Sequence, residues 1–322
     1  MERSATVPGI AAAEALGRGA SLERRATAWL VLLTVVWGSS FFSMKRGIAG
    51  MEPAVGAAAA PAAFLLFRFG LAAALYPLVF PRVFARLDRR TLADGLLLSL
   101  PFYAGFLLQV LGLPRTTATI SAFLTNLTVL STPIVGRLFF GEVFRGRVVA
   151  GAVLALAGVA VLTNPGGGGF GAGEILTAAS ALAFAFQVQL TNRLTRRSDP
   201  EGVTFVMFLA AIAFSAGTLL VLGVPPAAFV RSLSGTDVIW TGLLNAVLCS
   251  VLAITVMNRW QRELSPTRAV VIYCLEPVFA ALLAAAFGGE SIGWRVLAGG
   301  AVILAANAVC EGLVGKGRRA PA

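Results

Sequence analysis

The chain contains no histidine among its 322 residues and only three cysteines. The absence of histidine excludes Ser-His-Asp catalysis, histidine-based proton transfer and histidine metal sites. Cys249, Cys274 and Cys310 lie far apart inside apolar runs. This placement is typical of small core residues and not of a disulfide or zinc framework. We therefore expect no catalytic centre and no metal.

A phosphate-binding loop is also missing. The segment Gly315-Lys316-Gly317 lacks both the following Ser or Thr and the glycine spacing of a Walker A motif. Work driven directly by ATP hydrolysis is therefore not expected, and the sequence indicates no other cofactor.

Charge is scarce as well. Charged residues make up only 13% of the chain, against 57% hydrophobic residues, and the mean hydropathy is +0.84. A soluble domain of this length needs more polar surface. The net charge of +11 does not indicate nucleic acid, because the charges lie in short loops between apolar runs. We expect lipid and a small molecule as partners, and the sequence leaves the oligomeric state open.

The apolar runs are about 20 residues long, which is enough to cross a bilayer. Ten predicted spans lie near 28–46, 60–80, 93–113, 118–140, 146–163, 173–192, 202–223, 238–258, 267–288 and 294–314. A glycine-rich segment at 166–171 separates them into five and five.

This division predicts five segments of the chain. They are a cytoplasmic tail at 1–27, a first five-helix repeat at 28–164, a linker at 165–172, a second five-helix repeat at 173–315 and a tail at 316–322.

Basic residues are unevenly distributed among the loops. With both termini on one side, twenty of the 26 lysines and arginines fall on that side and five on the other, while Arg68 lies inside a span. Because positive charge marks the cytoplasmic side, the sequence predicts a multi-pass protein of the cell (inner) membrane with both termini in the cytoplasm.

The two halves contain the same sequence pattern. Residues 119–162 align without a gap with 267–310, at a constant offset of 148, and both stretches read as apolar helix, Gly-Glu, apolar helix. An odd number of spans in each half inverts the second half. The predicted fold is therefore an all-α polytopic membrane protein of ten transmembrane helices in two inverted five-helix repeats.

Several short motifs resemble the EamA-type family of the drug/metabolite transporter superfamily. They are Trp37-Gly38-Ser39-Ser40-Phe41 followed by Lys45, Arg68-Phe69, and the run from Leu275-Glu276-Pro277 to Gly289-Glu290. The resemblance covers roughly 28–314. It implies ten helices, two inverted repeats and a central substrate cavity, with export of small metabolites, amino acids or drugs.

One position departs from the internal symmetry. Val129 stands where the second half has Pro277, and Pro133 follows one helical turn later. We therefore expect the kink of the fourth span to be displaced toward the cytoplasm.

Substrate sites of inverted-repeat transporters lie where the repeats meet, so the repeat-related fourth and ninth spans are the places to look for one. These two spans present matching polar faces. In the ninth span Tyr273, Glu276 and Ala280 share a face; the equivalent positions of the fourth are Thr125, Thr128 and Thr132. Glu276 lies near mid-span, where an ionised carboxylate costs about 2.5–3.5 kcal/mol. It could carry a proton or meet a substrate amine; alternatively it is a structural clamp beside Pro277.

Other polar and aromatic residues could line a cavity or pack helices together. These candidates are Arg68, Trp37, Tyr103, Gln109, Asn126, Gln187 and Asn245. Arg68 could serve a cavity, a gate or a structural ion pair, and Lys45 is expected to anchor the first span at the outer interface. Glu142 and Glu290 are interpreted as structural carboxylates at the starts of helices.

The sequence thus favours a secondary transporter that exports small organic solutes by alternating access. The alternative is a channel, scramblase or scaffold of the same fold without proton coupling. An intramembrane enzyme is not expected, because no histidine is present and the predicted spans contain no pair of aspartates.

Overall fold

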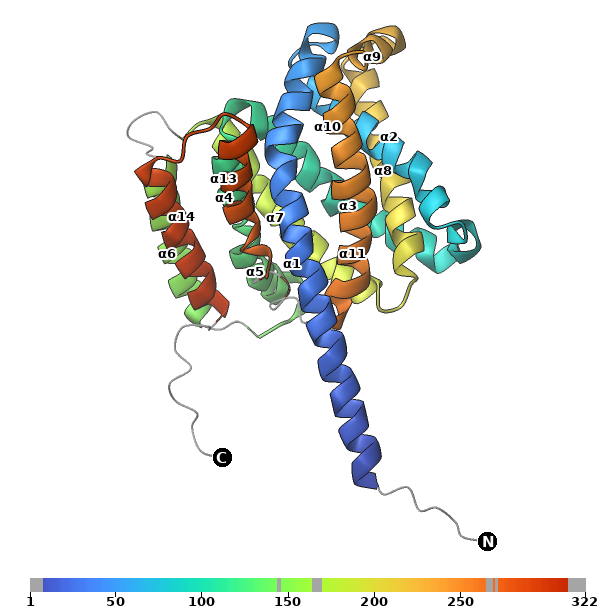
Figure 1. Cartoon of the computed structure of the whole chain (residues 1–322), viewed down its shortest axis with the longest axis vertical. Helices are drawn as coiled ribbons and strands as arrows, with labels where there is room; N and C mark the ends of the chain where they lie inside the picture. Colours follow the sequence, from blue (N-terminus) through green and yellow to red (C-terminus); the bar gives the residue numbers. More distant parts are fainter. Residues whose placement is uncertain (1–7, 144–145, 164–169, 265–268, 270–271, 312–322) are drawn as a thin grey trace.

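The computed structural model describes residues 8–143, 146–163, 170–264, 269 and 272–311, and within these residues it contains helices and turns but no strand (Figure 1). The N-terminal end of α1 and the C-terminal end of α14 lie at one end of the bundle, here named the termini end. The short helix α9 lies at the opposite, far end. In chain order the elements are α1 (Pro8–Val55), α2 (Ala60–Val79), η1 (Val83–Arg86), α3 (Arg89–Gly112), η2 (Leu113–Arg115), α4 (Ala118–Thr125), α5 (Thr128–Phe140), α6 (Gly146–Thr163), α7 (Ala172–Leu194), α8 (Pro200–Val221), α9 (Pro226–Ser232), α10 (Thr236–Ala246), η4 (Val247–Leu252), α11 (Ala253–Trp260), η5 (Gln261–Glu263), α13 (Glu276–Phe287) and α14 (Trp294–Glu311).

Seven helical segments are long and apolar enough to cross a membrane. They are Ser21–Val55, Ala60–Val79, Arg89–Arg115, Ala118–Phe140, Ala172–Leu194, Pro200–Val221 and Thr236–Glu263; shorter apolar helices lie at Val149–Thr163, Glu276–Phe287 and Trp294–Val309. Only 44–67% of the most apolar window of each long segment is buried, so many apolar side chains face outward, where lipid can cover them. The chain therefore has an all-helical, multi-pass membrane fold. All ten predicted ranges contain helix, and the crossing of the membrane by the three shorter ones stays a prediction.

The first helix is longer than the predicted span at 28–46 and runs back into the predicted tail at 1–27. The helix does not end at Lys45 and Arg46 but continues to Val55. The side chains of both residues have partners within the protein. Lys45 donates to the backbone carbonyl of Thr116, and Arg46 forms a 3.0 Å ion pair with Asp237. Most of the predicted linker (165–172) and the predicted tail at 316–322 lie outside the described residues.

The fourth and ninth spans are interrupted at equivalent points. The fourth is broken at Asn126 and Leu127, between α4 and α5, and the ninth has a turn at Cys274 and Leu275, just before α13. These positions differ by the same offset of 148, so the expected displacement of the fourth-span kink was wrong. The fourth span has no proline at its break. There the Thr128 hydroxyl donates a hydrogen bond to the Thr125 carbonyl at 2.7 Å. Pro133 lies inside α5 and does not break it.

The two Gly-Glu turns also have equivalent geometry. Gly141 and Gly289 have φ of 69° and 70°, a left-handed conformation that glycine adopts without strain. In each turn the N–H of the following glutamate bonds back to a carbonyl six residues earlier: Glu142 to Gly136 at 3.0 Å and Glu290 to Ala284 at 3.2 Å. The internal sequence match is thus accompanied by matching local structure.

Helices α6 and α14 pack closely against each other beside the main bundle (Figure 1). Small residues permit this approach: a Cβ added to Gly299 would lie 2.7 Å from the backbone of Leu162, and one added to Gly158 would lie 2.8 Å from Ile303. Close packing through small residues is the usual way for helices to associate in lipid.

Candidate functional site

A cavity lies between the two halves of the chain and draws on α1, α2, α3, α4, α5, α7, α11 and the start of α13. It is lined by Trp37, Ser40, Arg68, Phe102, Phe106, Gln109, Thr125, Asn126, Thr128, Val129, Phe184, Gln187, Val188, Ile254, Met257, Tyr273 and Glu276. The space that water centres can occupy in it is about 80 Å³. At about 10–15 Å³ per water this leaves room for a few waters. A larger solute can therefore enter only if the walls move.

Nine of the eleven residues singled out in the sequence line this cavity. Tyr103 and Asn245 do not. The Tyr103 ring packs on Phe214 at 5.3 Å and its hydroxyl lies 3.4 Å from Thr218, so it faces α8. Asn245 donates 2.9 Å bonds to Ser43 and to the Thr241 carbonyl, between α1 and α10. Helical spacing identified the polar stripes, but it could not tell the cavity side of a helix from a helix contact.

A π-helical turn, η4, shapes one wall of the cavity. The carbonyl of Cys249, in the middle of this turn, accepts 3.2 Å bonds from the Trp37 indole and from the Arg68 guanidinium. Arg68 also donates to the Ser250 hydroxyl at 2.7 Å. A π-turn shifts the backbone hydrogen-bond register, and such turns are frequent at functional sites. It turns a backbone carbonyl toward two residues of the cavity wall.

Asn126 ties the two interrupted spans together. Its side-chain N–H donates to the carbonyl of Tyr273 at 3.0 Å, and its oxygen accepts from Asn307 at 2.6 Å. The Tyr273 ring packs against Trp37 at 5.7 Å, while its hydroxyl donates to Gln261 at 2.8 Å. These contacts fix the Tyr273 and Trp37 rings, which form the aromatic wall of the cavity.

Glu276 is half-buried and begins α13, so its carboxyl lies both on the cavity wall and at a helix N-terminus. Within the described part of the chain, no side chain or backbone N–H donates a hydrogen bond to it. A carboxylate at this point is favoured by the helix dipole and stays available to a solute or proton.

Toward the far end of the bundle, Glu290 joins the two halves. The Glu290 carboxylate accepts from the backbone N–H groups of Ala118 and Thr119 at 2.6 and 3.1 Å, and from the Thr119 hydroxyl at 2.8 Å. Glu290 therefore caps α4, in the other half, and not the helix that follows it in sequence. Within the first half, Lys45 bonds to the Thr116 carbonyl, just before α4. Sequence reasoning gave Lys45 an anchoring role and missed this contact.

Related contacts lie at the termini end. Asn192 donates to the Leu264 carbonyl at 3.0 Å. Asn192 follows Lys45 by 147 residues and Leu264 follows Thr116 by 148, close to the offset of the matched stretches, so this bond lies at nearly the repeat-related place of the one made by Lys45. Glu142, the counterpart of Glu290, accepts from Gln189 at 3.1 Å and from Arg193 at 2.8 Å.

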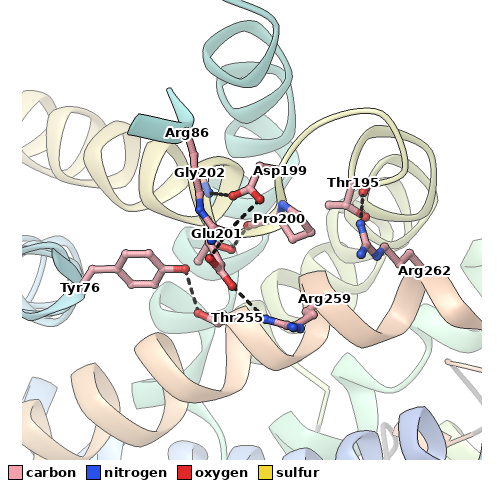
Figure 2. A network of polar contacts seen from close by, with 11 residues as sticks. Tyr76, Arg86, Thr195, Asp199, Pro200, Glu201, Gly202, Thr255, Arg259 and Arg262 are labelled. Carbon is pink, nitrogen blue, oxygen red and sulfur yellow. Dashed lines mark hydrogen bonds and ion pairs between the residues drawn. The ribbon is translucent and has the colours of Figure 1, made fainter. Parts of the chain in front are cut away.

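A network of ion pairs joins loops and helices at the termini end (Figure 2). Glu201, nearly buried at the start of α8, accepts from Arg86 and also from Arg259, the latter at 2.9 Å. Arg86 in addition pairs with Asp199 at 3.0 Å. Nearby, Asp88 caps α3, and hydrogen bonds from Thr91 hold the pKa of its carboxyl below the usual range. The ion pairs hold η1, α8 and α11 together at this end.

The described residues include no group of three or more His, Cys, Asp or Glu side chains placed to hold a metal. The cavity also has apolar wall residues that the sequence did not single out, among them Ile254 and Met257. No signal could have found them, because an apolar residue facing a cavity looks the same in sequence as one facing lipid or core.

An interrupted-helix bundle with a cavity between two related halves defines a class of membrane transport protein. Comparison with known proteins agrees. The sequence profile of the EamA-like transporter family matches residues 24–164 and again residues 171–310, so the chain belongs to this family. An uncharacterized transporter of Archaeoglobus fulgidus is 30% identical over 263 residues, which cover 81% of this chain and 77% of the relative. A solved crystal structure superposes with a TM-score of 0.65 at 20% identity, covering 92% of this chain and 99% of its own, and so shares the fold.

Proposed function

We propose that the protein exports small organic solutes across the cell membrane by alternating access, with ten spans in two inverted repeats and both termini in the cytoplasm. The observation that carries this proposal is a pair of contacts at opposite ends, which we take to close the cavity: Lys45 with Thr116, within the first half at the far end, and Asn192 with Leu264, within the second half at the termini end. Repeat-related contacts at opposite ends of one cavity suit a protein that opens one end at a time. The double match of the family profile supports the two-repeat organisation.

The orientation rests on charge. The termini end supports a cytoplasmic assignment, because it has Arg86, Arg193, Arg196, Arg197, Arg259 and Arg262. Glu276 is assigned the coupling proton, because it lines the cavity and accepts no bond from the described residues. The substrate exchanges with this proton as the two ends open in turn.

Flux in proteoliposomes tests the proposal. The vesicles contain a mixture of amino acids, organic acids and amines, and mass spectrometry follows their release with and without a pH gradient. Saturable, gradient-driven release of some solutes is expected. Unsaturable leakage of every small solute, or movement of labelled lipid alone, would replace the proposal by the channel or the scramblase.

A variant of Glu276 tests the coupling. Glu276→Gln keeps the size of the side chain and removes its ionisation, so release should lose its response to the pH gradient while the protein stays folded. Glu276→Ala serves as the comparison. If the Gln variant behaves as wild type and the Ala variant loses both expression and flux, Glu276 is a structural clamp and not the coupling group.

A further inference from the structure

Arg68 is the feature of the cavity that the mechanism above leaves unexplained. The residue belongs to α2, and its side chain is fully buried, at 0% exposure. It makes three contacts with uncharged atoms: the Ser250 hydroxyl at 2.7 Å, the Cys249 carbonyl at 3.2 Å and the Met44 sulfur at 3.1 Å. A cation buried in a low-dielectric interior normally has a counter-ion, since its desolvation is costly.

No such counter-ion is present among the residues that the structure describes. The ion pairs among the described residues all involve other arginines, and none includes Arg68. Glu276 lines the same cavity but forms no ion pair with it. The cavity therefore contains a fixed positive charge whose partner is missing from its walls.

The guanidinium retains donors for a ligand. It carries five N–H groups, and the three contacts use one on each nitrogen. One N–H on each terminal nitrogen is left over. Two such donors in one plane match the two oxygens of a carboxylate, which a lysine ammonium cannot match in the same way.

Aromatic rings surround this charge. The guanidinium carbon lies 4.6 Å from the centre of the Phe106 ring and 5.2 Å from that of Phe69. Phe106 in turn packs edge-on against Phe102 at 4.9 Å and Phe184 at 5.4 Å, and these three rings line the cavity. A ligand whose charge reaches Arg68 would place its remaining atoms among these rings.

We propose that Arg68 is a carboxylate-binding subsite and that the transported solutes are organic acids with an apolar or aromatic body. This inference rests on the proposed transport function and names the substrate class of the same cavity. The carboxylate supplies the missing counter-ion, and the phenylalanine rings cover the apolar body. The small volume of the closed cavity means that the acid binds only as one end opens.

Three matched probes test the charge requirement on the purified wild-type protein in nanodiscs. They are 3-phenylpropionate, its neutral amide 3-phenylpropionamide, and the cation phenethylamine, which share an aromatic body and differ in the polar group. Calorimetry should give at least a tenfold tighter Kd for the acid than for the other two. Equal binding of acid and amide, preference for the amine, or no binding of the acid overturns the proposal.

Variants separate a subsite from a structural clamp of the π-turn. Arg68→Gln removes the charge and Arg68→Lys keeps it, while Arg231→Gln, in α9 at the far end, is the control. The preference for the acid should vanish in the Gln variant, weaken in the Lys variant and persist in the control. A folded Arg68→Gln protein that keeps wild-type affinity for the acid refutes the subsite. If the Gln variant does not fold, the probe series on wild type and on Arg68→Lys decides.

The flux assay distinguishes failure of this inference from failure of the transport function. Saturable release of amines or neutral solutes, with no binding of the acid, leaves transport standing and removes the subsite. Tight binding of the acid without saturable release of any solute leaves the subsite standing and removes transport.

Discussion

The two ends of the cavity are closed by equivalent positions but by different chemistry. At the far end the contacts are charged: Lys45 reaches the Thr116 carbonyl, and Glu290 accepts three bonds from the start of α4. At the termini end the contact equivalent to that of Lys45 is the neutral amide bond from Asn192. Hydrogen bonds to charged groups contribute about 1.5–3 kcal/mol, and neutral ones about 0.5–1.5 kcal/mol.

The Gly-Glu turns differ in the same sense. Half-buried Glu290 joins the two halves of the chain, because its partners lie in α4. Glu142 also joins the two halves, because its partners lie in α7, but its pair with Arg193 is exposed, with 41% and 40% of the two side chains accessible. Among these repeat-related contacts alone, the far end is held by the stronger bonds, and we therefore expect the termini end to open more readily in the absence of substrate.

A single reporter measures this difference. Ser40→Cys places a thiol on the cavity wall in a background in which Cys249, Cys274 and Cys310 are replaced by alanine. Its labelling by an impermeant maleimide, added to one face of the membrane at a time, reports which end is open. A cysteine at Ser234, exposed beyond α9, marks the far face.

The largest expected effect is that of Glu290→Gln. The amide retains one acceptor oxygen and no charge, so part of the cap on α4 is lost. At about 1.4 kcal/mol per factor of ten, labelling of the reporter from the far face should rise about tenfold or more. Glu52→Gln, exposed at the same end, is the control and should change nothing. Unchanged labelling in Glu290→Gln would contradict a closing role for this carboxylate.

Much of this arrangement follows from sequence. The apolar runs predicted where the helices lie, and the 148-residue offset indicated which positions correspond, including the two Gly-Glu turns. Polar stripes at helical spacing predicted most of the residues around the cavity. These features are local or periodic, so the order of residues contains them directly.

The rest depends on contacts between distant segments. The absence of proline at Val129 suggested a displaced kink, whereas Asn126 and Thr128 support a break at the symmetric place through side-chain bonds. Nothing near Glu290 in sequence indicates that it caps a helix more than 170 residues earlier in the chain. The π-turn at Cys249 likewise becomes meaningful only once Trp37 and Arg68 are seen to donate to it.

A matched pair of variants sharpens the comparison of the two ends. Lys45→Met and Asn192→Leu each remove the side-chain donor of one closing contact and keep an apolar side chain of similar size. Lys45→Met should raise labelling from the far face, and Asn192→Leu should raise it from the termini face by a smaller factor, about threefold, since a neutral bond is lost. A change on the same face in both variants would disprove the correspondence between the two contacts.

The smallest effect is expected for Glu142→Gln. The variant loses only the exposed pair with Arg193, and exposed ion pairs contribute about 0–1 kcal/mol. Labelling from the termini face should therefore change less than about fivefold. In the wild-type protein, labelling from the termini face should change in the same direction as in the variant when salt rises from about 50 mM to about 500 mM, because salt screens exposed charges. A Glu142→Gln effect as large as that of Glu290→Gln, and insensitive to salt, would mean that the bonds of Glu142 to α7 hold the termini end as firmly as Glu290 holds the far end. The difference between the ends would then lie only in the contacts made by Lys45 and Asn192.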